Sequence, residues 1–147
     1  MKKGYLLLLL GAIPAAGLAI FSVLNSGNVA ETSVDDKDVD LRTRHYLIDL
    51  QNFVAEVEKI IPALSTYGKS WRLTTSSIYE KSAQIKAEVP VIFFTDDLEI
   101  KAVSDETKGK VAVDVRSASR VGTSDLGENR RHILQILKAL DGKFADK

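Results

Sequence analysis

The chain has 147 residues, with 20 Lys or Arg, 20 Asp or Glu and no cysteine. This length suits one domain around a single core. Without cysteine there are no disulfides, thiolate zinc sites, thiol nucleophiles or lipidated cysteines. Outside Lys2 and Lys3, 18 basic residues face 20 acidic ones. A charge balance this even argues against nucleic acid as a partner.

An uncharged, apolar segment extends from Gly4 to Leu24. At about 1.5 Å per residue it reaches roughly 31 Å as a helix, which is enough to cross a bilayer. The alternative is a signal peptide cleaved at a small-x-small site such as Gly17-Leu18-Ala19. Cleavage there would leave an apolar new terminus that begins with Ile20. Residues 1–27 are therefore predicted to be an uncleaved anchor, with a signal segment as the alternative.

The charges on either side of this segment predict its topology. Two lysines precede it and acidic residues follow it, so the positive-inside rule places the N-terminus in the cytoplasm and the rest of the chain outside. Residues 28–40 are acidic and poor in apolar side chains, which predicts a flexible tether. Residues 41–147 are predicted to form the folded domain.

The first half of the domain is predicted to contain one helix and three strands. A strand over Arg44 to Ile48 is followed by Asp49, which can cap a helix. The apolar residues of this helix recur with helical spacing: Leu50, Phe53, Val54, Val57, Ile61 and Leu64. Pro62 limits or kinks the last turn. Strands at about 71–75 and 83–89 follow.

A hairpin is predicted from about Phe94 to Arg120, with its turn at residues 105–108 beside Gly109. If Ser104 pairs with Gly109, three apolar pairs form across the strands: Ala102 with Val111, Ile100 with Val113, and Leu98 with Val115. On the other face of the sheet, this register sets Asp97 opposite Arg116.

The last predicted element is a helix with Asp125 and Glu128 at capping-box spacing. Its buried stripe is predicted to contain Leu126, Ile133, Ile136, Leu137 and Leu140. Gly142 is predicted to end it. The element order is then β-α-β-β-β-β-α. An antiparallel sheet of about five strands with two helices packed on one face would bury both helical stripes, which predicts an α+β fold.

Two segments of this hairpin and helix are similar to a known family. Residues 94–100 read FTDDLEI, and residues 113–130 read VDVRSASRVGTSDLGENR. They resemble the F-x-D-D strand and the R-S-x-S-R-x-G-x-S-D-x-G-x-N junction of the family catalogued as domain of unknown function 1499. The resemblance covers roughly residues 42–140, most closely in the second half. It implies a bacterial protein with an N-terminal export or membrane segment, and it implies no activity, because none is established for the family.

Strand alternation predicts a polar cluster on the inner face of the sheet. Asp96, Ser117 and Ser119 share that face with the valines, and Asn129 and Arg130 should face them from the last helix. The favoured interpretation is a hydrogen-bonded network that docks the helix. A ligand site and a catalytic site are the alternatives.

The outer face of the same strands carries two arginines, Arg116 and Arg120. Beside a helix N-terminus they could hold a phosphate or carboxylate, but Asp97, Asp114 or Asp125 are predicted to occupy them. The candidate ligand or network residues are Asp96, Asp97, Arg116, Ser117, Ser119, Arg120, Ser124, Asp125, Asn129 and Arg130.

Other features give no catalytic or metal site. Asp96 and Asp97 are neighbours on one strand and point to opposite faces, so they cannot act as a hydrolytic dyad. His45 and His132 have no second ligand at metal spacing, and His132 is predicted to be solvated. No metal or cofactor is expected.

The sequence therefore predicts a binding or scaffold module of the bacterial cell envelope. The module would be held in the cytoplasmic membrane by one span or, alternatively, exported after signal cleavage. Its partner would be an unknown envelope protein or small ligand. The alternative function is a small-ligand receptor or enzyme that uses Asp96, Ser117, Ser119, Asn129 and Arg130. A deep pocket there with Arg130 unpaired would favour the alternative, whereas a closed and bonded cluster would favour the module.

Overall fold

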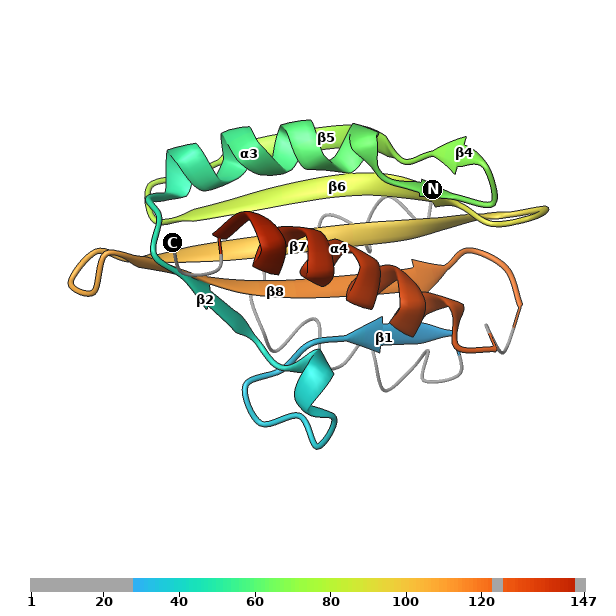
Figure 1. Cartoon of the computed structure of the whole chain (residues 1–147), viewed down its shortest axis with the longest axis horizontal. Coiled ribbons are helices and arrows are strands. Elements are labelled where there is room, and N and C mark those ends of the chain that lie inside the picture. Colours follow the sequence, from blue (N-terminus) through green and yellow to red (C-terminus); the bar gives the residue numbers. More distant parts are fainter. Residues whose placement is uncertain (1–27, 123–125, 145–147) are drawn as a thin grey trace, which may run out of the picture.

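The computed structural model describes residues 28–122 and 126–144 of the chain (Figure 1). A six-stranded antiparallel sheet has the order β1-β8-β7-β6-β5, and β2 also pairs with β8. Helices α3 and α4 lie over one face of this sheet (Figure 1). The fold class is α+β, as predicted. The elements are β1 (Val29–Glu31), the 3-10 helix η1 (Val39–Leu41), β2 (Arg44–Tyr46), α3 (Leu50–Ala63), β3 (Ser65–Thr66), β4 (Lys69–Ser70), β5 (Arg72–Ile78), β6 (Ser82–Pro90), β7 (Thr95–Asp105), β8 (Lys110–Ser119) and α4 (Glu128–Phe144).

Helix α3 begins at the predicted cap. The Asp49 side chain accepts a hydrogen bond from the backbone N–H of Asn52 at 2.9 Å, which satisfies a donor that the first helical turn leaves free. Five of the six predicted stripe residues are buried: Leu50, Phe53, Val54, Val57 and Ile61. Pro62 lies in the last turn, and the helix ends one residue later.

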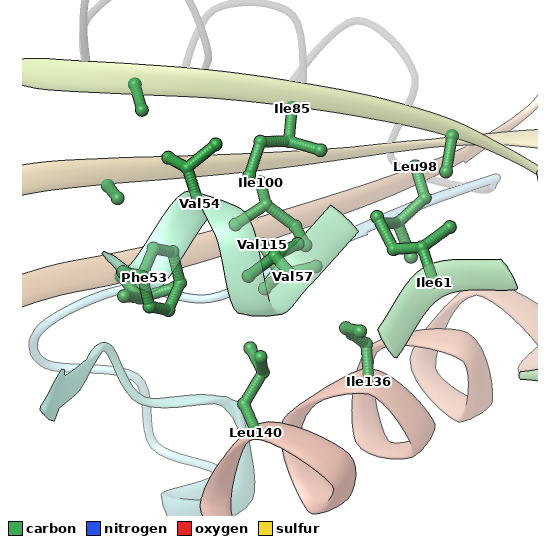
Figure 2. Close-up of a cluster of buried hydrophobic side chains, with 14 of the residues drawn as sticks. Phe53, Val54, Val57, Ile61, Ile85, Leu98, Ile100, Val115, Ile136 and Leu140 are labelled. Atoms are coloured by element: carbon green, nitrogen blue, oxygen red, sulfur yellow. The ribbon is translucent and has the colours of Figure 1, made fainter. Parts of the chain in front are cut away.

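The hydrophobic core lies between the two helices and the sheet. Figure 2 shows Val57 of α3 and Ile136 of α4 in one cluster with Ile100 and Val115 of the sheet. Burial of each such side chain stabilises the fold by about 1.5–3 kcal/mol. The packing of both helices against one sheet face therefore creates a single core.

The β7–β8 hairpin forms where it was predicted, but the predicted register was wrong by two residues. Ile100 pairs with Val115 rather than Val113. The apolar residues alternate with a period of two, so a shift by two exchanges partners without moving any side chain to the other face. The turn decides between these registers: residues 106–109 form it, and Gly109 closes it at a φ of 62°.

Residues 28–40 are not the flexible tether that was predicted. Strand β1 pairs with the end of β8, with Val29 opposite Ala118. The chain then leaves the sheet, passes through η1 and returns as β2 beside the first half of β8. The acidic side chains take part in this local structure, because Asp38 caps η1 by accepting from the Asp40 N–H at 3.1 Å.

Helix α4 differs from its prediction at both ends. It continues past Gly142 to Phe144, whose ring centroid lies 5.2 Å from that of Tyr46 and 5.5 Å from that of Phe53. These contacts hold the last turn against the core. At the other end, Leu126 has a φ of 52° and is 85% exposed, so it lies outside both the helix and the buried stripe.

The two edges of the sheet differ. On one side, β1 and β2 both cover the edge of β8, whereas on the other side β5 has no further strand beside it in the described part of the chain. Strand β5 is largely exposed and rich in threonine and serine, and its pairing with β6 is interrupted by a bulge between Leu73 and Thr75.

The predicted anchor or signal segment, residues 1–27, lies outside the described residues, as do Ser124 and Asp125. Across residues 28–122 and 126–144, no helix combines the length and the apolar character needed to cross a bilayer.

Candidate functional site

A polar cluster lies between the end of the β7–β8 hairpin and the first turns of α4. We call it the inner cluster and define it as Asp96, Ser117, Ser119, Asn129 and His132. Asp96 pairs with Ser119 across the strands. Asp96 is 3% exposed, and Ser117, Asn129 and His132 are 1% exposed or less. These four side chains are therefore closed to solvent, and Ser119 is partly buried.

Asn129 connects the parts of the inner cluster. Its side-chain nitrogen donates to Ser119 Oγ at 2.8 Å and to the backbone carbonyl of Asn28 at 2.8 Å. Its side-chain oxygen accepts from Ser117 Oγ at 2.7 Å. One asparagine thus joins helix α4 to β8 and to the segment that leads into β1, as a docking network requires.

His132 is the basic side chain that faces Asp96, and the prediction that it is solvated was wrong. Its Nδ1 lies 3.4 Å from Asp96 Oδ2, and its Nε2 lies 3.3 Å from Glu128 Oε2. The ring packs edge-on against Trp71, with 6.2 Å between ring centroids. Trp71 covers the flank of α4 on which His132 lies, and this explains its burial.

Arg130 lies outside the inner cluster, contrary to the prediction. Its side chain is 44% exposed and donates through Nε to Asp38 Oδ2 at 2.9 Å. The prediction had counted Leu126 among the buried residues of the last helix, and this moved the inferred centre of its buried face toward Arg130. The observed face is centred near Asn129, and at about 100° per residue Arg130 points about 100° away from it whereas His132 lies within about 60°.

Glu128 connects the inner cluster to the surface. It accepts a hydrogen bond from the Tyr67 hydroxyl and lies 3.0 Å from the Arg131 guanidinium. Burial acts to raise the pKa of Glu128, but the hydrogen bonds from Tyr67 and Arg131 outweigh it, so this pKa lies below its usual value. Tyr67 and Gly68 form the tight turn between β3 and β4, at φ values of 51° and 76°. The hydrogen bond from Tyr67 to Glu128 holds this turn against the start of α4.

Ser117, His132 and Asp96 do not form a catalytic triad. Ser117 Oγ lies 3.5 Å from Nδ1 of His132, the same ring nitrogen that faces Asp96. In a triad the two ring nitrogens bond separately to the nucleophile and to the acid. Ser117 is also fully buried. Among the described residues, no group of three or more His, Asp or Glu side chains could hold a metal ion.

Two carboxylates bind Arg120 on the outer face. Its Nε lies 3.0 Å from both carboxylate oxygens of Asp97, and its Nη2 lies 2.7 Å from Glu88. The hydrogen bonds that Arg120 donates to the Asp97 carboxylate raise the pKa of Arg120. The prediction had set Asp97 opposite Arg116, but the observed register sets Arg116 opposite Glu99.

An open pocket with a volume of about 330 Å³ lies on the outer face, between residues 31–35 and strands β7 and β8. Arg116 and Lys101 supply cations, and Glu99 is among the carboxylates that line it. Arg116 is only 7% exposed. Burial lowers its pKa, and Glu99 acts in the opposite direction. One wall of this pocket is the segment that had been interpreted as a tether, so the pocket could not be predicted from the sequence.

A family model described as "Protein of unknown function (DUF1499)" matches residues 21–140. The chain belongs to the DUF1499 family. The resemblance seen in residues 94–100 and 113–130 is thereby confirmed. No curated protein and no solved structure matches this chain.

In this DUF1499 domain the predicted site residues that the structure describes separate into four places. Asp96, Ser117, Ser119 and Asn129 belong to the inner cluster, Asp97 and Arg120 form an outer pair, and Arg116 lines the pocket. Arg130 pairs with Asp38. His132 and Tyr67 were not among the predicted site residues. The spacing of His132 from Ile136 and of Glu128 from His132, four residues each, was the signal that could have found the histidine.

Proposed function

We propose that this DUF1499 chain is a membrane-tethered binding or scaffold module of the cell envelope, and that the inner cluster is a structural network. The closure of the cluster supports this: Asp96, Ser117, Asn129 and His132 are each at most 3% exposed. Arg130, whose lack of a partner would have favoured a ligand site, is bound to Asp38. Polar groups that bond one another out of solvent fix a packing arrangement.

The sequence of residues 1–27 supports the membrane anchor in this proposal. The apolar run from Gly4 to Leu24 is long enough to span a bilayer. Lys2 and Lys3 before it favour a cytoplasmic N-terminus, which would place the domain on the outer side.

The outer face of the sheet is the surface we propose for a partner, because helices α3 and α4 cover the other face (Figure 1). It carries the Arg120 ion pairs and the pocket beside residues 31–35. Charges of both signs on one face give specificity to an interface more than affinity.

A small-ligand receptor is the second candidate, and the pocket of about 330 Å³ favours it. Arg116 and Lys101 line it together with Glu31, Glu99 and Asp114. A ligand that carries both charges would match this lining better than a simple anion.

Site-specific photo-crosslinking in native membranes tests the proposal. A photoreactive residue at Val103, which is 52% exposed on β7, reports on the outer face, and one at Lys59 on α3 is the matched control. We expect a discrete crosslinked species from position 103 that is absent from position 59. Equal labelling from both positions contradicts a binding face. A small molecule that co-purifies with the parent protein and is lost in Lys101→Ala supports the receptor instead.

A further inference from the structure

Five large apolar side chains are exposed at one end of the sheet. We call this set the apolar rim: Ile92 (57% exposed), Phe93 (86%), Phe94 (53%), Val121 (58%) and Leu126 (85%). Isolated exposed apolar residues are ordinary, but a group of them gathered at one end of a domain marks an interaction surface.

The strand register brings the rim together. Pro90 pairs with Thr95, so residues 91–94 form the loop at this end of β6 and β7, closed by a hydrogen bond from Val91 N to the Phe94 carbonyl at 2.8 Å. Asp96 pairs with Ser119, so β8 leaves the sheet at the same end and leads directly to Val121. Helix α4 starts there as well (Figure 1).

The described chain also begins at this end. The Asn28 carbonyl accepts from Ser119 N at 2.9 Å, and its side chain donates to the Gly122 carbonyl at 2.8 Å. Strand β8 separates β1 from β7. Neighbouring strands lie about 4.8 Å apart, so the point of entry is about 10 Å from the start of β7.

The distance from the proposed anchor to this end is short. Residues 25–27 alone separate Leu24 from Asn28. Four residue steps span at most about 14 Å when fully extended, and the lipid headgroup region takes up about 5–8 Å of that length. With only residues 25–27 between the anchor and Asn28, the end of the sheet that carries the rim would lie beside the lipid headgroups.

We propose that the apolar rim docks onto the outer lipid leaflet beside the chain's own anchor, with Phe93 and Phe94 inserted at the interface. This inference rests on the anchor of the proposed function. Aromatic side chains suit the boundary between headgroups and acyl chains. The anchor makes rim binding an intramolecular step at high effective concentration, so a small apolar area suffices. The strands would then stand upright on the membrane, with the turn at residues 106–109 farthest from it.

Depth-dependent quenching tests this orientation in the full-length protein. Vesicles of phosphatidylethanolamine and phosphatidylglycerol with brominated acyl chains supply the quencher. Phe93→Trp is the reporter. Leu47→Trp is the control, because Leu47 is 67% exposed and follows β2 at the opposite end, where Tyr46 pairs with Val111. The native Trp71 is 2% exposed, and the parent protein gives its background. We expect the emission of Phe93→Trp to shift to the blue and to lose most of its intensity in brominated vesicles. The emission of Leu47→Trp should be the same in brominated vesicles and in vesicles without bromine.

The possible outcomes distinguish a failure of the rim docking from a failure of the anchor. Protein that resists carbonate extraction but shows equal quenching at positions 93 and 47 overturns the docking and leaves the anchor intact. Protein that carbonate extracts, or whose intact mass shows a chain starting at Ile20 or later, overturns the anchor and the docking together. A blue shift at position 93 without quenching by bromine indicates that this side chain is buried against protein rather than lipid, and it also overturns the docking. Leu126→Trp, at 85% exposure, is the second reporter if Phe93→Trp does not fold.

Discussion

The Nδ1 atom of His132 lies 3.4 Å from the carboxylate of Asp96, and both side chains are hidden from solvent. This contact joins helix α4 to strand β7 through two ionisable groups. If either side chain is removed, the other stays buried and loses one of its charged partners, and such a loss is costly in a buried pair.

We therefore expect His132→Ala to lower the free energy of unfolding by about 3 kcal/mol, from the broken pair and the cavity left by the ring. Urea denaturation at neutral pH measures this. The chain has two histidines, and His45 is exposed. His45→Ala is thus the matched control, with an expected change within about 0.5 kcal/mol. A His132→Ala protein as stable as the control variant would show that the inner cluster is not a structural network.

The Asp38 and Arg130 pair should contribute little, and its contribution should depend on pH. The hydrogen bond from Arg130 is the main cause that lowers the pKa of Asp38 below 3.8. A carboxylate with a lowered folded pKa stabilises the protein above the unfolded value, and this stabilisation is lost as the pH falls through the folded pKa. We expect Arg130→Ala to be slightly less stable than the parent at pH 6, and we expect this difference to shrink only as the pH falls below 3.8 toward the lowered pKa of Asp38. A difference that persists or grows in acid would contradict this pairing.

The observed register predicts which charges couple across the sheet. Asp97 contacts Arg120 through both carboxylate oxygens, and both side chains are partly exposed. A double-mutant cycle on Asp97→Ala and Arg120→Ala should therefore give a coupling of about 0.2–1 kcal/mol. A cycle on Asp97→Ala and Lys59→Ala, where Lys59 lies on α3, is the control and should give none. Coupling well above about 2 kcal/mol would mean that something covers this face.

Two glycines should respond to alanine in opposite directions. Gly109 has a φ of 62° in the β7–β8 turn, so Gly109→Ala is expected to cost about 1–2 kcal/mol. Gly142 lies within α4, and a Cβ there would meet no atom within 4 Å. Gly142→Ala should therefore stabilise the protein by about 0.5–1 kcal/mol. Thermal denaturation of both variants measures the signs, and the same sign for both would contradict the turn or the helix end described here.

Features encoded by local spacing could be predicted from the sequence. The cap at Asp49 and the stripe of α3 follow from residues within one or two turns of each other. The inward position of Asp96 and Ser117 follows from strand alternation, which survives a register error of two residues. For this reason the three strand members of the inner cluster were found although the partners across the hairpin were wrong, and Asn129 was found from the helical spacing of α4.

Features that depend on distant parts of the chain could not be predicted in this way. The burial of His132 depends on Trp71, which reaches α4 from the other half of the domain. Strand β1 has three residues, too few for a periodic pattern to identify, and it exists because β8 offers it an unpaired edge. The outer pocket depends on the same segment.

Within residues 28–122 and 126–144, one edge of β5 pairs with no other strand, and this edge has a consequence for the behaviour of the protein at high concentration. An unpaired strand edge is a template on which a second copy can add, and long, flat, apolar edges promote such aggregation. Strand β5 presents threonine and serine along this edge and is bent by the bulge between Leu73 and Thr75. Many copies of the domain can therefore lie close together without joining their sheets into a continuous assembly.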